Sequence, residues 1–559
     1  MPTGDPRDLP FIPADYQPAL PLENTILTEP PDPEAVELDV LFVGGGPAGL
    51  AGAIELARLV RKHNEAGGGL GEVSIGVLEK ADALGENNLS GAVVNPIAFR
   101  ELFPELKIED FPFRQPVTTE RVYLLPNSRY RLRVPVPFTM HNRGNYVTSV
   151  CEVVRWLGEK AEAEGVHIFT GFPAAALLTQ GARVLGVRTE PGGLDREGKP
   201  GAGFQPATDI AARVTVLSEG TRGLLTQSYL HWQGVLSENP PTFALGVKEI
   251  WETRKPLDAV IHTLGWPVPS NVFGGSFMYP LEPNVVGIGL VIGLDYRQLD
   301  LDIHELLQRL KLHPVIRQYL EGGEMVEWGA KTIPEGGYWS LPGRRHGDGL
   351  LLAGDCAGFV DVASLKGMHY AMKSGMLAAR AILDALVSGD TSAAALAPYD
   401  AMVNDSFILK DLYIHRNMRL AFKSGLIMGG IKATLLEWTN GAFPSGRPQG
   451  ERDSDVARRR VGKEPFVPDG KLTFSKLDAV FKSGNRTRDN IPNHLLMDRD
   501  VPFEVAELYA NLCPAGVFER HGNVLRMNPP NCVDCKATDV LGPRWTPREG
   551  GSGPKYRRM

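Results

Sequence analysis

Short apolar runs alternate with longer amphipathic stretches over much of the chain. Residues 38–43 (Leu-Asp-Val-Leu-Phe-Val) predict a buried strand, and apolar residues at helical spacing predict a helix over 47–62. The pattern returns with strands at 73–79, 166–170, 183–189, 212–217 and 349–355 and with helices at 152–164 and 366–387. Such an alternation of strands and helices predicts an α/β nucleotide-binding fold.

A second pattern, with strands and few helices, occupies residues 240–340. The expected strands are 242–250, 262–265, 275–279 and 285–292. A helix over 303–320, broken near Pro314, ends the region. We therefore expect an antiparallel sheet inserted into the nucleotide-binding fold. Upstream, strands at 121–125 and 130–134 predict a hairpin.

Residues 400–440 are apolar and helical, and the stretch 424–438 has two possible interpretations. It is too short and too interrupted to span a bilayer, which takes about 20 apolar residues. The two interpretations are a buried core helix and a helix that lies in a membrane interface, with Trp438 at the level of the headgroups. The polar stretch 441–468, rich in Pro, Arg and Asp, then indicates a domain boundary.

Composition narrows the possible classes of protein. The chain has 559 residues, a net charge of −7 and five cysteines. The length predicts several domains, the charge argues against nucleic-acid binding, and so few cysteines indicate a reducing compartment. We expect the basic clusters 458–460 and 557–558 to be solvated. The N-terminal stretch, Pro-rich and acidic at 30–34, has no signal-peptide or transit-peptide pattern, and we expect a poorly ordered arm.

A glycine-rich turn joins the first strand to the first helix. Gly44 permits a tight turn, Gly46 permits close approach of a pyrophosphate, and Gly49 permits close packing of helix on strand. Pro47 suits a first helical turn, and this helix start, which includes Ala48, offers N–H groups and a positive dipole end to phosphates. The turn is weak evidence by itself because glycine-rich turns are common.

An acidic residue at the end of the next strand strengthens the prediction of a dinucleotide site. Glu79, followed by Lys80, can accept hydrogen bonds from both hydroxyls of an adenosine ribose. The gap exceeds the usual spacing of about 20 residues, and the Gly-rich insert 66–71 accounts for the excess. The loop 85–96, which contains Ser90 and Gly91, can wrap the flavin part of such a ligand.

A second glycine–aspartate pair, Gly354-Asp355, ends a strand far downstream. In flavoproteins such a pair meets the ribityl chain and the pyrophosphate. The helix 366–387, which starts beside Gly367, then points its N-terminus at the isoalloxazine. Because the pair comes after an inserted sheet, the expected ligand is FAD rather than NAD. The alternative is that Asp355 is a simple loop cap.

Three of the five cysteines lie close together near the C-terminus. Cys513 precedes a proline, and Cys532 and Cys535 form a Cys-x-x-Cys pair. This spacing resembles the thiolate ligation of an iron–sulfur cluster in ferredoxins. A zinc site with His521 and a structural turn with two cysteines are the alternatives. A ferredoxin-like site expects a further cysteine where this chain has Thr538.

Together these stretches resemble the electron-transfer flavoprotein:ubiquinone oxidoreductase family from about Leu38 to the C-terminus. The specific matches are 43–49, 89–91, 141–146, 265–267, 274–277, 287–296, 366–375, 513–517 and 531–536. The resemblance implies an α/β plus α+β protein with a glutathione-reductase-like FAD-binding Rossmann domain, an inserted antiparallel-sheet quinone domain and a C-terminal ferredoxin-like iron–sulfur domain. The implied boundaries are 1–36 for the N-terminal arm; 37–115, 145–240 and 341–395 for the FAD domain; 116–144, 241–340 and 396–445 for the quinone-binding and membrane-contacting domain; 446–464 for a linker; and 465–559 for the iron–sulfur domain.

The resemblance also implies a function. The family carries FAD and a [4Fe–4S] cluster, and it attaches monotopically to the membrane that holds the quinone pool. It passes electrons from reduced electron-transfer flavoprotein to a quinone, ubiquinone or menaquinone, without a catalytic acid, base or nucleophile. Gly274-Gly275 match the pair that lines the quinone headgroup pocket, and 122–138 and 424–440 match the surface that enters the bilayer. His141 and Tyr279 are candidate proton donors.

The chain departs from the family at the fourth cluster ligand, where Thr538 replaces a cysteine. Three thiolates suffice for a [3Fe–4S] cluster, or for a [4Fe–4S] cluster with an oxygen ligand from water, Thr538 or Asp539, and either arrangement changes the reduction potential. We expect a cluster to bind. The competing interpretations are a reductase-type or hydroxylase-type flavoenzyme and a flavin-binding protein with a degenerate cluster domain. We expect the cytoplasmic face of a bacterial inner membrane, or the mitochondrial inner membrane in a eukaryote.

Overall fold

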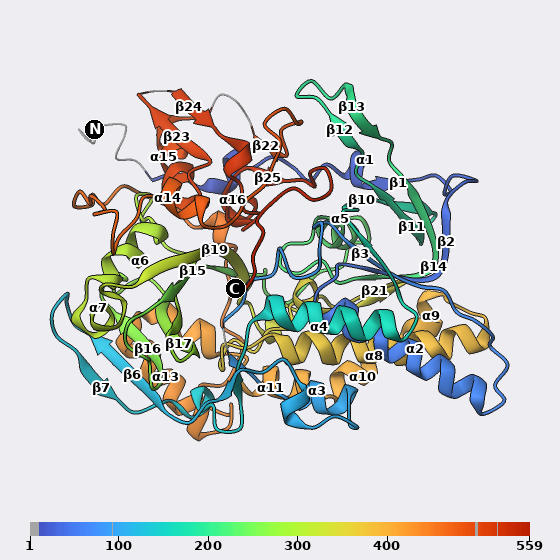
Figure 1. Cartoon of the computed structure of the whole chain (residues 1–559), viewed down its shortest axis with the longest axis horizontal. Helices are drawn as coiled ribbons and strands as arrows, with labels where there is room; N and C mark the ends of the chain where they lie inside the picture. Colours follow the sequence, from blue (N-terminus) through green and yellow to red (C-terminus); the bar gives the residue numbers. More distant parts are fainter. Residues whose placement is uncertain (1–9, 92, 498–500, 523) are drawn as a thin grey trace.

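A nine-stranded sheet organises the first half of the fold in the computed structural model, which describes residues 10–91, 93–497, 501–522 and 524–559 (Figure 1). Its strands are β1 Ile26–Leu27, β2 Val36–Val43, β3 Ile75–Glu79, β9 His167–Thr170, β10 Ala174–Gln180, β11 Arg183–Thr189, β14 Asp209–Leu217, β20 His346–Gly347 and β21 Leu350–Leu352. The order is β1-β10-β11-β14-β2-β3-β9, with β21 also paired to β14. Pairing is parallel from β9 through β3, β2 and β14 to β21, which confirms the predicted α/β fold.

Three long helices pack beside the parallel strands: α2 Pro47–Glu65, α4 Val150–Ala163 and α8 Met368–Ser388. Helix α2 contacts both α4 and α8, and the three lie side by side in Figure 1. Helices α2 and α8 approach closely because Gly375 has no side chain: a Cβ there would lie 2.0 Å from the Ala48 carbonyl oxygen. This packing places the first turn of α2 against Gly375 of α8.

A seven-stranded sheet forms the second half. Its strands are β6 Glu120–Leu125, β7 Leu132–Val134, β15 Phe243–Glu252, β16 Val260–Gly265, β17 Gly274–Glu282, β18 Val285–Gly293 and β19 Glu324–Pro334, in the order β19-β15-β18-β17-β16-β6-β7. The four predicted strands pair antiparallel. Two features differ from the expectation: the hairpin strand β6 joins the sheet parallel to β16, and β19, with its charged residues, adds an unpredicted strand beside β15.

Helices complete this half. Helices α6 Ile303–Lys311 and α7 Pro314–Leu320 confirm the predicted break before Pro314. Helix α13, Leu426–Trp438, buries only Gly429 and Leu436, while Ile427 is 78% and Trp438 71% exposed. The interpretation of this stretch as a buried core helix is therefore wrong. In the described ranges, no helix is long and apolar enough to cross a membrane.

The C-terminal region packs small elements against the second sheet. They are α14 Lys476–Phe481, α15 Phe503–Leu512, α16 Ala537–Leu541, β22 Leu495–Leu496, β23 Phe518–His521, β24 Val524–Met527 and β25 Arg544–Trp545. Buried residues of this region, among them Leu508 and Leu541, belong to the same hydrophobic cluster as Trp328 of β19 and Ile316 of α7. The cysteine region therefore shares a core with the inserted sheet.

Shorter elements connect these parts. They are α1 Leu22–Thr25, α3 Ile97–Leu102, α5 Leu224–Trp232, α9 Ala393–Leu396, α10 Pro398–Asp405, α11 Phe407–Ile414, α12 Met418–Ala421, β4 Val93–Val94, β5 Gln115–Pro116, β8 Tyr146–Val147, β12 Gly192–Leu194 and β13 Pro200–Gln205. Strands β12 and β13 pair as a hairpin within the polar, Gly-rich stretch between two strands of the first sheet.

Two segments expected to be loosely attached are held by distant partners. Arg458, placed by its sequence in a solvated cluster, is fully buried and donates to the carbonyl oxygens of Leu294 and Tyr296 at 2.6 and 2.9 Å. The described part of the N-terminal arm is ordered, since β1 pairs with β10 and the Phe11 N–H donates to the Arg458 carbonyl. Both expectations were wrong because composition does not reveal backbone acceptors far away in the chain. Residues 1–9 of the arm lie outside the described residues.

Candidate functional site

A single cavity of about 500 Å³ takes its walls from both large sheets. It brings together nearly all the residues expected to bind FAD or quinone: Gly44, Gly46, Pro47, Ala48, Glu79, Lys80, Ser90, Gly91, Gly274, Gly275, Gly354, Asp355 and Gly367. Gly49 is the exception among these residues and does not line it. The cavity therefore joins the glycine turn, the second glycine–aspartate pair and the glycine pair of β17 in one space.

The glycine turn has a geometry that only glycine accommodates. Gly44 has a φ of +116°, and a Cβ there would lie 2.4 Å from the Ser218 carbonyl oxygen. A Cβ at Gly49 would lie 2.3 Å from the Gly44 carbonyl oxygen, so this residue permits the helix to pack on the turn. A Cβ at Gly46, which lines the cavity, would come no closer than 3.8 Å to another side chain, that of Asn88. These contacts fit a pyrophosphate held by backbone N–H groups at the start of α2.

Glu79 lies at the end of β3, as its place in the sequence predicts. Its carboxylate accepts hydrogen bonds from the N–H groups of Gly45 and Ala81 at 3.1 and 2.9 Å. An ionised carboxylate has further acceptor sites, so it can also bind ribose hydroxyls. Lys80 lines the same cavity, but its ammonium group is paired with Asp534 of the cysteine region and contacts Asn87 at 3.1 Å.

Asp355 follows β21, which lies on the side of the glycine turn away from β3 and Glu79. Burial raises the pKa of Asp355 to about 6, and the positive charge of Lys331 offsets part of this increase. Lys331 also lines the cavity, and burial lowers its pKa to about 8. Hydroxyl groups of a bound ligand would favour the ionised form of Asp355 by donating to it. Lys331 was missed because the strand that carries it, β19, was not predicted.

The part of the cavity wall that β17 forms contains two glycines, Gly274 and Gly275, and the large side chain of Tyr279. A Cβ at Gly274 would lie 2.4 Å from the Val291 carbonyl oxygen, and one at Gly275 would lie 2.8 Å from that of Thr263. Glycine is therefore required here by strand packing as well as by the cavity. Tyr279 lines the same cavity, with the ring of His262 at 5.6 Å in an edge-on arrangement.

The two candidate proton donors differ in position. Tyr279 is buried on the cavity wall, whereas His141 lies near Glu120 and is not among the residues that line the cavity. His262, which the sequence did not single out, lines it instead. Burial lowers the pKa of His262 to about 3, so its imidazole is neutral near pH 7 and can donate one N–H without carrying charge.

Part of the cavity wall comes from segments that also carry exposed apolar residues. Thr139 and Met140 line it together with Leu426, Ala433 and Glu437 of α13. The Glu437 carboxylate accepts from the Thr139 hydroxyl at 2.6 Å, which ties the two segments together. The exposed apolar residues of these segments and their neighbours form the apolar rim: Tyr130, Leu132, Phe138, Ile427, Met428, Ile431, Trp438 and Phe443.

The three C-terminal cysteines are all buried and free. Cys513, Cys532 and Cys535 belong to the same buried cluster of side chains. Burial raises the pKa of the Cys535 thiol, and the thiols of Cys513 and Cys532 raise it further. The other two cysteines bond elsewhere: Cys151 Sγ lies 3.2 Å from the Asn88 carbonyl oxygen and Cys356 Sγ 3.1 Å from that of Leu217. Three clustered thiols fit the ligand set of an iron–sulfur cluster.

His521 does not complete a zinc site with these thiols. It lies on β23 with its side chain 64% exposed, where it contacts Glu519 at 3.4 Å. The thiols, by contrast, are buried. The zinc site with His521 is therefore not supported.

Buried charges surround the cysteine loop. Asp534 accepts from Arg548 at 2.6 Å and from the Trp545 indole N–H at 2.9 Å, and it also pairs with Lys80. Trp545 lines the cavity as well, so the cysteine region and the cavity share a wall. These contacts could not be predicted from the sequence, because Lys80 and Asp534 are 454 positions apart.

Comparison with known proteins agrees with this architecture. Two family models match the chain: "ETF-QO, ubiquinone-binding" over residues 243–333, and "Electron transfer flavoprotein-ubiquinone oxidoreductase, 4Fe-4S" over residues 470–557. The first covers most of the inserted sheet, and the second covers the cysteine region. Among solved structures, a geranylgeranyl bacteriochlorophyll reductase-like protein from Thermoplasma acidophilum superposes with a TM-score of 0.54 at 17% identity, over 73% of this chain and 97% of that one, and shows the fold alone.

Curated relatives match nearly the whole chain. The electron transfer flavoprotein-ubiquinone oxidoreductase of Pseudomonas aeruginosa is 38% identical over 556 residues, which cover 94% of this chain and 100% of that protein. The mitochondrial protein of that name from Arabidopsis thaliana is 38% identical over 94% of this chain and 85% of its own length, and the human one 36% identical over 94% and 90%. The chain belongs to the electron transfer flavoprotein-ubiquinone oxidoreductase family.

Proposed function

We propose that this protein passes electrons from reduced electron-transfer flavoprotein to a membrane quinone, ubiquinone or menaquinone, using FAD and an iron–sulfur cluster. The observation that carries the proposal is the single cavity that joins the glycine turn 44–49, Gly354-Asp355 and Gly274-Gly275, with Trp545 of the cysteine region on its wall. When bound, the two cofactors supply the electron chemistry, and the chain positions them and sets their surroundings.

The proposed FAD site uses backbone groups more than side chains. The turn 44–49, with Pro47 and Ala48, and the start of α2 would hold the pyrophosphate, and Glu79 the adenosine ribose. Gly354-Asp355 would meet the ribityl chain. The other contacts are proposed at Lys80, Ser90, Gly91 and Gly367. Cys513, Cys532 and Cys535 would hold the cluster in the C-terminal region. This assignment corresponds to the expected FAD, quinone and iron–sulfur domains.

The proposed quinone site lies at Gly274-Gly275, between the flavin part of the cavity and the apolar rim. Backbone groups of β17 and the neutral side chains of His262 and Tyr279 can hydrogen-bond to a quinone carbonyl without placing a charge beside it. Quinone reduction also takes up two protons, and Tyr279 is the candidate donor that lines this cavity.

The apolar rim supports peripheral attachment to a membrane. Helix α13 carries part of this rim and also lines the cavity through Leu426 and Ala433, so a quinone could enter from the lipid without crossing water. We expect the triple substitution of Ile427, Ile431 and Trp438 by Ser to reduce binding to vesicles in a flotation assay. The exposed Leu236, away from the rim, provides the matched control Leu236→Ser. Equal binding of both variants would contradict the proposal. Attachment to the cytoplasmic face of a bacterial membrane stays a prediction.

The direct test is anaerobic steady-state reduction of a short-chain quinone by reduced electron-transfer flavoprotein, with FAD, iron and sulfide measured on the same sample. We expect FAD and iron to be present and quinone reduction to depend on the flavoprotein. Reduction by NADPH alone would instead favour a reductase-type or hydroxylase-type flavoenzyme. A yellow, iron-free protein without quinone reduction would favour the degenerate cluster domain.

A further inference from the structure

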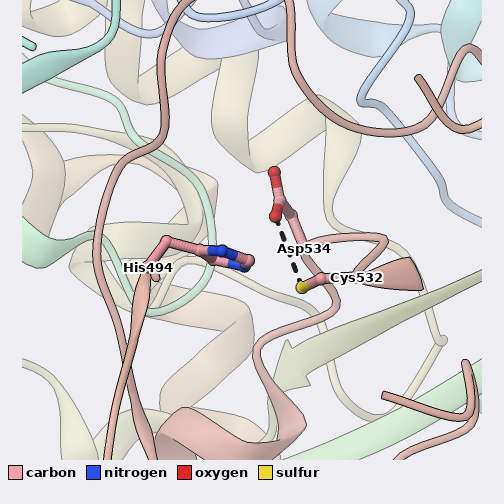
Figure 2. Close-up of side chains that lie close together, drawn as sticks. All are labelled: His494, Cys532 and Asp534. Carbon is pink, nitrogen blue, oxygen red and sulfur yellow. Dashed lines mark hydrogen bonds between the residues drawn. The ribbon is translucent and has the colours of Figure 1, made fainter. Parts of the chain in front are cut away.

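The buried carboxylate beside the cysteines is matched by cations of the chain itself. Figure 2 shows Asp534 beside Cys532 and His494, with a ring nitrogen of the histidine, the sulfur and a carboxylate oxygen within 4.8 Å of one another. Lys80 and Arg548 bind the Asp534 carboxylate. This group therefore needs no ligand from outside the chain to balance its charge.

The segments that carry the apolar rim have an excess of positive charge. Residues 121–151 and 412–436 together contain nine Arg and Lys residues and no Asp or Glu, in a chain with a net charge of −7. Five of these cations lie within four positions of a rim residue along the chain. We call them the cationic collar: Arg129, Arg131, Arg133, Lys423 and Lys432. Lys432 is half-buried, and the other four are exposed.

The two segments of the collar are neighbours in space. The hairpin of β6 and β7 lines a cavity of about 550 Å³ with residues 124–126, and the start of α13 lines the same cavity with residues 424–428. Farther along, Thr139 and Glu437 join the segment after the hairpin to the end of α13. Figure 1 also shows β6, β7 and α13 in one part of the molecule. The collar and the apolar rim therefore belong to one surface.

The hairpin has an apolar face and a cationic face. Successive side chains of a strand point to opposite faces, and the register pairs Leu124 with Leu132 and Tyr123 with Arg133. The guanidinium of Arg131 lies over the Tyr123 ring, 5.2 Å from its centre, so it shares the face of Arg133. Arginines beside an apolar face can extend their charged groups to lipid headgroups while that face enters the bilayer.

Within the described ranges, no residue of the collar has a carboxylate partner. Lys432 donates to a neutral group, the Ser424 hydroxyl, at 2.6 Å. Arg121, near the start of β6, is different because it pairs with Asp258 at 2.7 Å. The positive charge of the collar is therefore available to a ligand from outside the chain, and unpaired cations beside a membrane-binding surface attract anionic headgroups.

We propose that the cationic collar binds the headgroups of anionic phospholipids, so that the protein prefers a negatively charged bilayer. The inference rests on the proposed function, which supplies the attachment to a membrane. A bilayer fits this surface better than an acidic protein does, because Tyr130 and Leu132 alternate with the arginines and are themselves exposed. A bilayer covers such apolar side chains and binds the cations at the same time.

The test measures flotation of the full-length protein with vesicles of phosphatidylcholine, with and without phosphatidylglycerol. We expect the wild type to bind the anionic vesicles more tightly, and the difference to disappear at about 1 M salt, where the screening length falls to about 3 Å. One cation near an anionic bilayer strengthens binding about fivefold, so Arg129→Gln/Arg131→Gln/Arg133→Gln should lose about 100-fold in affinity for anionic vesicles. Its affinity for neutral vesicles should stay unchanged.

A matched control removes the same charge elsewhere. The variant Lys62→Gln/Lys199→Gln/Lys471→Gln changes three exposed lysines on other parts of the chain and should bind as the wild type does. Unfolding midpoints of both triple variants should stay close to the wild-type value, because all the changed side chains are exposed. If the arginine variant is nevertheless unstable, Lys423→Gln/Lys432→Gln decides, with an expected loss of about 25-fold.

Three outcomes would overturn the inference. The first is equal binding of the wild type to neutral and anionic vesicles, and the second is an equal loss in the arginine variant and its lysine control. The third is unchanged vesicle binding of the arginine variant with a raised KM for electron-transfer flavoprotein, which would assign the collar to an acidic partner protein. Failure of the proposed function looks different: a wild type that binds no vesicle of either kind would reject the membrane attachment itself, and this inference with it.

Discussion

The glycine turn 44–49 and the cysteine loop 532–539 take their surroundings from different sources. The turn is built from backbone groups at one end of β2 and α2, and a Cβ at Gly44 would come closest to another backbone atom, the Ser218 carbonyl oxygen. The cysteine loop carries two buried carboxylates, Asp534 and Asp539, and two of their cationic partners, Lys80 and Arg222, come from distant segments. Local backbone geometry can therefore be specified within a few residues, whereas buried charges need the whole fold to pair them.

The largest expected effect tests whether the two regions bind their cofactors independently: a substitution in the cysteine loop should remove the cluster and leave the flavin. In Cys535→Ser we expect iron and quinone reduction to be lost while FAD is retained, because a serine hydroxyl is a poor ligand for iron that prefers thiolates. Iron, FAD and activity are measured on one preparation. The control Cys356→Ser removes a thiol that is bonded elsewhere and should keep its iron. Loss of FAD together with iron in Cys535→Ser would show that the two regions are not separable.

Removing one buried charge of the cysteine loop should have the next largest effect. Asp534→Asn leaves Arg548, with a side chain only 2% exposed, and Lys80 without their carboxylate. Breaking a buried ion pair on one side typically costs about 3–5 kcal/mol. Denaturant unfolding of the protein should show this loss, and hydrogen exchange should locate it in the C-terminal region. Glu321→Gln, in the exposed Arg317–Glu321 pair, is the control and should change little.

Strain in the glycine turn should have the third largest effect, and it should act on the FAD site rather than on the cysteine loop. Gly44→Ala combines a φ of +116° with a Cβ 2.4 Å from the Ser218 carbonyl oxygen. We expect about 1–3 kcal/mol of destabilisation and reduced FAD content with iron retained. In the control Gly67→Ala, φ is +85° and no atom lies within 4 Å of the new Cβ, so it reports the backbone strain alone. Equal FAD loss in both variants would argue against the close contact.

The smallest effect concerns a peripheral ion pair of the first sheet. The hydrogen bond from Arg188 is the main cause that lowers the pKa of Asp209, and burial acts against it. A carboxylate with a lowered folded-state pKa stabilises the protein above its unfolded pKa of about 3.9, and this contribution is lost as the pH falls further. Unfolding midpoints between pH 7 and pH 3 should fall less steeply for Asp209→Asn than for wild type. Parallel curves would contradict this.

Much of the first sheet and its cavity could be predicted from the sequence. The strand ending at Glu79, the turn at Gly44 and the pair Gly354-Asp355 each have a local signature, and the structure brings them into one cavity. The sequence did not predict β19, because charged residues interrupt its apolar pattern. It also misplaced Arg458, whose carbonyl acceptors at Leu294 and Tyr296 lie more than a hundred positions away.

The sequence by itself determined where the backbone must turn, which thiols can bind metal, and that position 538 lacks one. Only the tertiary structure decided that Lys80 pairs with Asp534, that Trp545 lines the cavity and that His494 lies beside Cys532. The physical reason is the distance along the chain over which each effect acts. Backbone preferences act over a few neighbouring residues, whereas desolvation and charge pairing depend on whichever distant groups the fold buries together.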